Sequence, residues 1–102
     1  SHDELKEILK IQMKDVIATV ANKSVTLFIT DAGQDVILSE SHDPVSGARP
    51  MRRWVEKNVT TVLSNMLDNG EACEGSTLSI DAADLNRGLR YHVLKKQGST
   101  DP

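Results

Sequence analysis

The spacing of apolar residues changes several times along this chain of 102 residues, and each change marks a switch between helix and strand. Between residues 3 and 22, apolar side chains recur every three or four positions, which predicts a long amphipathic helix. Residues 24–30, Ser-Val-Thr-Leu-Phe-Ile-Thr, are largely β-branched or aromatic and partly alternate, which is typical of a strand. A chain that contains both periods has to pack helices against a sheet.

A short helix is expected after this strand. Thr30 and Asp31 offer N-cap oxygens, and the helix is predicted to end at about Ser41. Gly33 lies inside it and lowers the helix propensity by roughly 1 kcal/mol relative to alanine. The segment 41–47 contains proline, glycine and small polar residues, which indicates a loop.

A longer helix is predicted to begin at Pro50, a residue typical of a first helical turn, and to stop at Asn69-Gly70. Two alternating segments, residues 76–81 and 89–94, then predict a pair of strands. Together these elements predict an α+β fold in which three helices pack on a short three-stranded sheet.

Composition and charge narrow the class of protein. The mass of 11.2 kDa, with 38% hydrophobic and 26% charged residues, fits one globular domain. We expect this domain to span residues 3–95 and a disordered tail to follow over residues 96–102. The net charge of -3 lacks the basic excess that binds nucleic acid, so nucleic acid is not an expected partner. The single cysteine, the missing signal peptide and the lack of a membrane-length apolar run predict a cytoplasmic protein.

Familiar catalytic and nucleotide-binding motifs are absent from the sequence, including the glycine-rich loop that cradles phosphates. Cys73 has no histidine motif beside it, and we interpret it as an inert thiol. The three histidines fall in separate elements, so we interpret them as structural and expect no metal site: His2, His42 and His92. The chain alone is therefore not expected to be an enzyme.

Arginines gather in and just before the first turn of the predicted long helix. The helix dipole favours negative charge there, so each exposed cation costs roughly 0.3–1 kcal/mol. A guanidinium beside free backbone N–H groups can instead bind a phosphate or another anion. Arg49 is the strongest candidate, because Gly47 frees the backbone before it and Pro50 restricts the backbone after it.

Two side-chain groups of this helix have a second interpretation. Arg52 and Arg53 could pair with nearby acids and only keep the surface soluble. The acids in question are Glu40, Asp43 and Glu56. Trp54 could face a partner, but packing of this helix against the sheet is the preferred interpretation.

Residues 41–53, Ser-His-Asp-Pro-Val-Ser-Gly-Ala-Arg-Pro-Met-Arg-Arg, resemble the sensor-2 segment of the Clp family of AAA+ ATPases. The element order over residues 3–95 is similar to the C-terminal small subdomain of the second ATPase module, D2-small, in ClpB-type disaggregases. Two strings, at residues 9–16 and 52–57, resemble the plant cytosolic heat-shock branch. The resemblance implies the fold of an AAA+ small, or lid, subdomain.

The resemblance also implies a nucleotide-linked role for three residues, Gly47, Ala48 and Arg49. Arg49 matches the sensor-2 arginine, which reaches the phosphates of ATP or ADP held by the large subdomain of the same protomer. Gly47 and Ala48 are expected to let the backbone approach the nucleotide. Magnesium and the other catalytic groups would belong to the large subdomain, so this chain alone should have no ATPase activity.

The family assembles as homo-hexameric rings that unfold or disaggregate protein clients. The resemblance therefore implies that this chain packs on the large AAA+ subdomains of its own and the neighbouring protomer, with no membrane contact.

His42 and Ser46 stand where the family usually has aromatic residues, which removes packing around the loop that presents Arg49.

One alternative function is a non-catalytic Clp-like scaffold that binds protein partners. Another is nucleic-acid binding by the arginines, which would be salt-sensitive.

Overall fold

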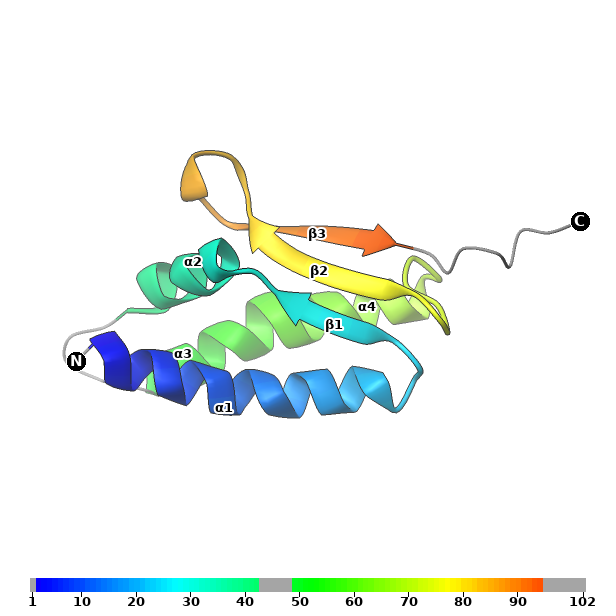
Figure 1. Cartoon of the computed structure of the whole chain (residues 1–102), viewed down its shortest axis with the longest axis horizontal. Coiled ribbons are helices and arrows are strands. Elements are labelled where there is room, and N and C mark those ends of the chain that lie inside the picture. Colours follow the sequence, from blue (N-terminus) through cyan, green and yellow to red (C-terminus); the bar gives the residue numbers. More distant parts are fainter. Residues whose placement is uncertain (1, 43–48, 95–102) are drawn as a thin grey trace, which may run out of the picture.

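The computed structural model describes residues 2–42 and 49–94. The tail predicted over residues 96–102 lies outside these ranges, so that prediction stays a prediction. Three helical rods pack beneath a twisted three-stranded sheet, as Figure 1 shows. The bounds of the helices are α1 His2–Ala21, α2 Asp31–Ser41, α3 Arg49–Val55, η1 Glu56–Thr60 and α4 Thr61–Asp68. The strands are β1 Thr26–Ile29, β2 Thr77–Ala82 and β3 Leu89–Leu94, with a short 3₁₀ turn, η2 Asp84–Asn86, between the last two.

The sheet has the order β1-β2-β3, with β1 parallel to β2 and β2 antiparallel to β3. Phe28, Ser79 and His92 lie in one cross-strand row. The helices cover one face of this sheet, and Phe28 and His92 are exposed on the other. The α+β class and the three-helix, three-stranded architecture are confirmed. The parallel pairing of β1 with β2 is an addition that the sequence pattern did not predict.

The hydrophobic core forms between the sheet and the helices. Residues from all three helical rods and from the strands contribute side chains with almost no exposed area. The largest fully buried side chains are Leu9, Ile37, Leu78, Ile80, Val25 and Val59. Each such aliphatic side chain stabilises the fold by about 1.5–3 kcal/mol relative to an exposed one. Trp54 packs against this core, as preferred from the sequence.

The start of α2 is held tightly against β2. Thr30 is the N-cap, as predicted, and its hydroxyl oxygen accepts the N–H of Gly33 at 3.0 Å. The same hydroxyl donates to Asp81 Oδ1 at 2.7 Å. A Cβ on residue 33 would lie only 2.8 Å from the carbonyl oxygen of Ile80. Gly33 is therefore required by this close approach, although it lowers the helix propensity of the segment.

The long helix predicted from Pro50 is one rod that contains a π-helical turn, η1, between α3 and α4. Its first four buried side chains are spaced by four residues, Met51, Val55, Val59 and Leu63, and Met66 follows three residues later. In a regular α-helix each such four-residue step drifts by about 40° around the axis, so the fourth side chain would leave the core face. The wider π-turn reduces this drift. The sequence predicted the rod but not the turn.

Candidate functional site

The candidate site inferred from the sequence lies where α2 ends and α3 begins. The helix α2 ends at Ser41, with His42 as its C-cap in an extended conformation. Gly47 and Ala48 lie outside the described residues, and Ser46 lies there too. Arg49 is the first residue of α3. The structure therefore places the backbone of Arg49 at a helix start, and the nucleotide-linked role of the three residues stays a prediction.

The orientation of α3 is fixed by its buried residues. Met51 and Val55 are 2% and 4% exposed and lie one turn apart on the core side of the helix. They anchor α3 in the core, and α3 also packs against α2. Because Arg49 lies two residues before Met51, its Cα position is set by the same anchor. The local sequence therefore combines a buried anchor with a cation at the beginning of one helix.

Arg52 and Arg53 project from this anchored helix and are exposed. Across the ranges 2–42 and 49–94, neither arginine forms an ion pair. Glu40 instead accepts the N–H of Gly88 at 2.6 Å, which ties the end of α2 to the β2–β3 connection. The alternative that Glu40 or Glu56 neutralises these arginines is therefore not what the structure shows. Asp43, the third acid considered, lies outside the described residues.

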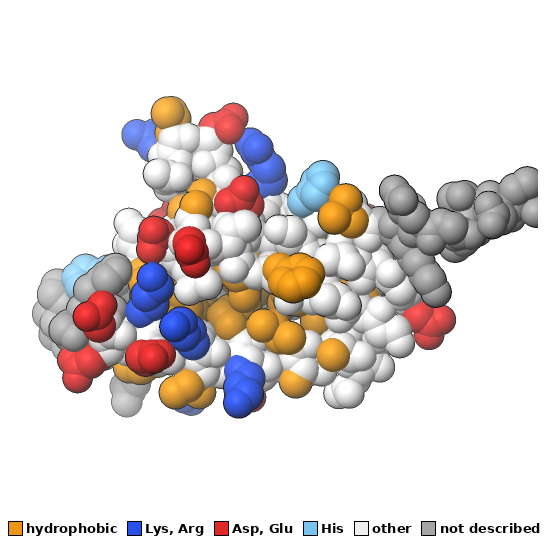
Figure 2. Space-filling model, in the orientation of Figure 1, with side chains coloured by type: hydrophobic (Ala, Val, Ile, Leu, Met, Phe, Trp, Pro, Cys, Tyr) orange, Lys and Arg blue, Asp and Glu red, His pale blue; other side chains and the backbone are white. Residues whose placement is uncertain are grey.

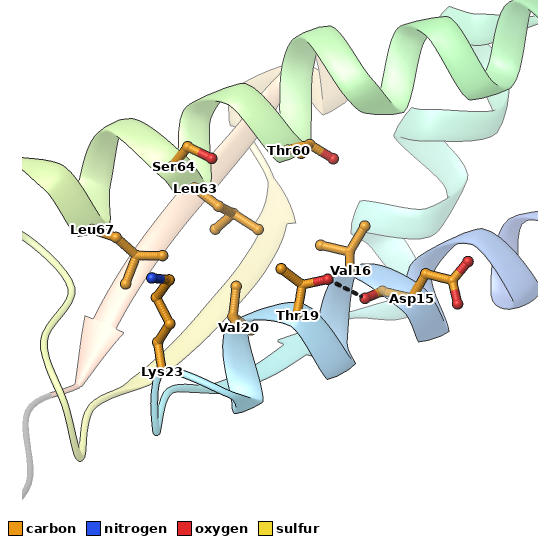
Figure 3. Close-up of a pocket in the computed structure, with 9 residues that line it drawn as sticks. All are labelled: Asp15, Val16, Thr19, Val20, Lys23, Thr60, Leu63, Ser64 and Leu67. Carbon is orange, nitrogen blue, oxygen red and sulfur yellow. Dashed lines mark hydrogen bonds between the residues drawn. The ribbon is translucent and has the colours of Figure 1, made fainter.

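A separate pocket of about 260 Å³ opens between α1 and α4 (Figure 3). Its walls are mostly apolar, and an acid and a lysine lie toward opposite ends. The Thr19 hydroxyl donates to the Asp15 backbone carbonyl at 2.9 Å, so its proton is already used within α1. The full lining is Asp15, Val16, Thr19, Val20, Lys23, Thr60, Leu63, Ser64 and Leu67. This pocket suits an apolar group and offers no cluster of cations for a phosphate.

Near this pocket, a second hollow of about 390 Å³ extends toward α3. The two share Asp15, Val16 and Thr60, and the second also includes Arg52 and Glu56. Charges of both signs line it.

Within the described part of the chain, no group of three or more histidine, cysteine or acidic side chains could hold a metal ion.

Asp81 and Tyr91 have shifted pKa values, and both shifts have structural causes. The hydrogen bond from Thr30 lowers the pKa of Asp81 below 3.8, with the N–H of Ala82, at 2.8 Å, acting in the same direction. Burial raises the pKa of Tyr91 to about 12. Its hydroxyl donates to the carbonyl oxygen of Asn58 in η1 at 2.6 Å. The sequence does not predict this contact, since nothing in the pattern indicates that β3 supports a π-turn.

The fold defines a class of domain. The element order and a three-stranded sheet with helices on one face are those of an AAA+ small subdomain. Among the helices that the structure describes, none is long and apolar enough to cross a lipid bilayer.

Comparison with known proteins identifies the family within that class. The family model of the C-terminal, D2-small domain of ClpB protein matches residues 1–80. The chaperone protein ClpB of Clostridium perfringens is 32% identical over 84 residues, 82% of this chain and 10% of that protein. The Clp protease ATP-binding subunit ClpC of Staphylococcus aureus USA300 is 30% identical over 98 residues, 96% of this chain and 12% of that protein. The chain belongs to the family of ClpB D2-small domains.

Proposed function

We propose that this chain is the small lid subdomain of an ATP-dependent protein disaggregase or unfoldase, with Arg49 as its sensor-2 arginine. Membership of the ClpB D2-small family supports the proposal. The observation that carries it is the position of Arg49 at the start of a helix anchored by Met51. The chain spans about a tenth of the length of the relatives it matches. The remaining catalytic machinery therefore belongs to the rest of a longer parent protein.

The chemistry expected of Arg49 is recognition of phosphate charge. A guanidinium presents several N–H donors in a plane and stays protonated, which suits the oxygens of a triphosphate. The first turn of α3 contains no acidic residue that would compete for this cation. Gly47 and Ala48 precede it and would let the backbone approach the nucleotide. ATP or ADP with Mg²⁺ would be held by the large subdomain and contacted by this chain at one side.

The proposed partners follow from this role. The domain over residues 3–95 would pack on the large subdomain of its own protomer and on that of the neighbour in a homo-hexameric ring. Clients would be unfolded or aggregated proteins, and the compartment would be the cytoplasm. Exchange of ATP for ADP would change the contact of Arg49 and rotate the lid, which couples hydrolysis to movement.

A second candidate function is a non-catalytic scaffold that keeps the Clp-like fold. One observation favours it: His42, which stands where the family usually has an aromatic residue, is exposed at the end of α2. An exposed imidazole packs less area around the following loop than a buried aromatic ring would. Loss of that support would weaken the presentation of Arg49.

ATP turnover by the full-length parent separates the two functions. With Arg49→Ala we expect at least about a tenfold loss of turnover, because the charge that stabilises the phosphoryl group is removed. Arg87→Ala is the matched control, since Arg87 is exposed on the connection between β2 and β3. The free energy of unfolding of the isolated chain should change little in both variants. Equal turnover by the wild type and Arg49→Ala would contradict the proposal and favour the scaffold.

A further inference from the structure

The strand β1 lies at an edge of the sheet, and one of its sides pairs with no described strand, although α1 lies beside it. β1 pairs only with β2 among the described strands. Thr26 and Thr30 donate their N–H groups to the carbonyls of Ser76 and Ile80, at 3.1 and 2.9 Å. Backbone groups alternate in direction along a strand, so the N–H groups of Leu27 and Ile29 point away from β2. This edge of β1 has the polar groups that another strand would need.

A groove of about 330 Å³ follows this edge and is closed on its other side by α1. Leu27, Phe28 and Ile29 all line it. Three consecutive strand residues cannot share one face of a sheet, so the wall of the groove is the strand edge itself. Leu9 and Met13 of α1 are buried and form apolar lining. Figure 2 shows hydrophobic side chains gathered on the face where Figure 1 shows α1 beside β1.

The charge of the groove has one sign. Lys10 and Lys14 line it one helical turn apart, and none of its lining residues is acidic. Lys10 Nζ is 3.9 Å from Glu7 Oε2, and both side chains are more than half exposed, so this ion pair is weak. Lysine or arginine side chains are visible beside the hydrophobic patch in Figure 2. A ligand with carboxylates would complement this rim.

One end of the groove also holds an unsatisfied polar atom. Gln34 Oε1 is buried and has no hydrogen-bond partner among the described residues. The amide nitrogen of the same side chain donates to the carbonyl of Ile29 at 3.5 Å, which is long for a hydrogen bond. Buried acceptors are normally paired, but this oxygen has almost no accessible surface, so it would meet an incoming backbone N–H only after the Gln34 side chain rotated toward the groove.

We propose that this groove binds an extended, acidic segment of another polypeptide, which adds as a strand to the free edge of β1. Its backbone would pair with Leu27 and Ile29. Alternate side chains of a strand are about 6.7 Å apart, and residues four apart on a helix rise by about 6 Å, so two carboxylates can face Lys10 and Lys14 together. The intervening apolar side chains would lie beside Phe28, which is 57% exposed. In strand addition of this kind, hydrogen bonds between the backbones supply the affinity, and contacts of alternate side chains supply the specificity.

The test uses the whole chain and a blocked synthetic peptide, Ser-Val-Glu-Val-Glu-Val-Ser, followed by the backbone amide signals in NMR spectra. We expect saturable shifts at Leu27 and Ile29. The matched peptide with lysine in place of both glutamates should bind at least about tenfold more weakly, because its charges would repel Lys10 and Lys14 instead of attracting them. A peptide with proline in place of the central valine should also lose binding, since its N–H is missing.

Charge reversal on the protein gives the matched pair of variants. Lys14→Glu should weaken binding of the glutamate peptide about fivefold or more, while Lys57→Glu, an exposed change in η1, should leave it within twofold. Amide spectra of both variants serve as the control for folding and should keep the dispersion of the wild-type spectrum. Equal binding of the two charged peptides, shifts confined to the α1–α4 pocket, or no saturable shift would overturn the proposal. Concentration-dependent shifts of Leu27 and Ile29 without peptide would also overturn it, because a second copy would then be the occupant.

Discussion

Gly33 shows how one residue can oppose a local preference and still be required by the fold. In the sequence it lowers the expected stability of the short helix by roughly 1 kcal/mol. In the structure it lets the start of α2 approach the backbone of β2, where a Cβ would lie 2.8 Å from the Ile80 carbonyl oxygen. The N–H of Gly33 also completes the cap on Thr30. The requirement comes from a residue 47 positions later in the chain (80 minus 33), so sequence pattern alone could not predict it.

Gly33→Ala should therefore destabilise the protein by about 1–2 kcal/mol, since the clash with fixed backbone outweighs the gain in helix propensity. The measurement is the free energy of unfolding in urea. Ser39→Ala, at an exposed position of the same helix, is the control and should be neutral or slightly stabilising. A more stable Gly33→Ala variant would show that the α2–β2 approach is looser than described.

At the scale of elements, the periodicity of apolar residues predicted three helical rods and three strands, and all six are present. It did not predict the π-turn η1, because a spacing of four residues fits a helix whether or not the helix is locally widened. Nor did it predict which strands pair in parallel, since pairing depends on contacts between distant segments. The Tyr91 hydroxyl of β3, which donates to the carbonyl of Asn58 inside η1, is likewise a contact between segments distant in the sequence.

Tyr91→Phe tests this link. Loss of the hydrogen bond to Asn58 should cost about 1 kcal/mol of unfolding free energy near neutral pH. The pKa of Tyr91 is raised from 10.0 to about 12, so its contribution is complete below pH 10.0 and is lost as the pH rises through about 12. The wild type should therefore lose stability across that window, and the variant should lose less.

Because the chain contains one tyrosine, tyrosinate absorbance reports the titration of this residue directly. A titration midpoint at the ordinary tyrosine value, or an equal alkaline loss of stability in Tyr91→Phe, would contradict the described contact.

At the scale of the whole molecule, the domain is a one-sided α+β sandwich whose described residues include the helix start of the proposed anion site and an unpaired strand edge. The sequence predicted a helix start at Pro50, because proline is typical of a first helical turn, and in the structure α3 begins one residue earlier, at Arg49. It did not predict the groove between α1 and β1, because that groove exists only once β1 has become an edge strand. Features that depend on local spacing were therefore predictable, whereas those that depend on topology were not.

The central proposal is that Arg49 senses the terminal phosphate of a nucleotide held elsewhere in the parent protein. The most direct measurement is the affinity of the full-length parent, blocked in hydrolysis, for ATP and for ADP, with and without Arg49→Ala. We expect a preference for ATP in the wild type that falls by about tenfold in the variant, because only ATP offers the γ-phosphate. An ATP-to-ADP preference that is the same in both proteins would contradict it.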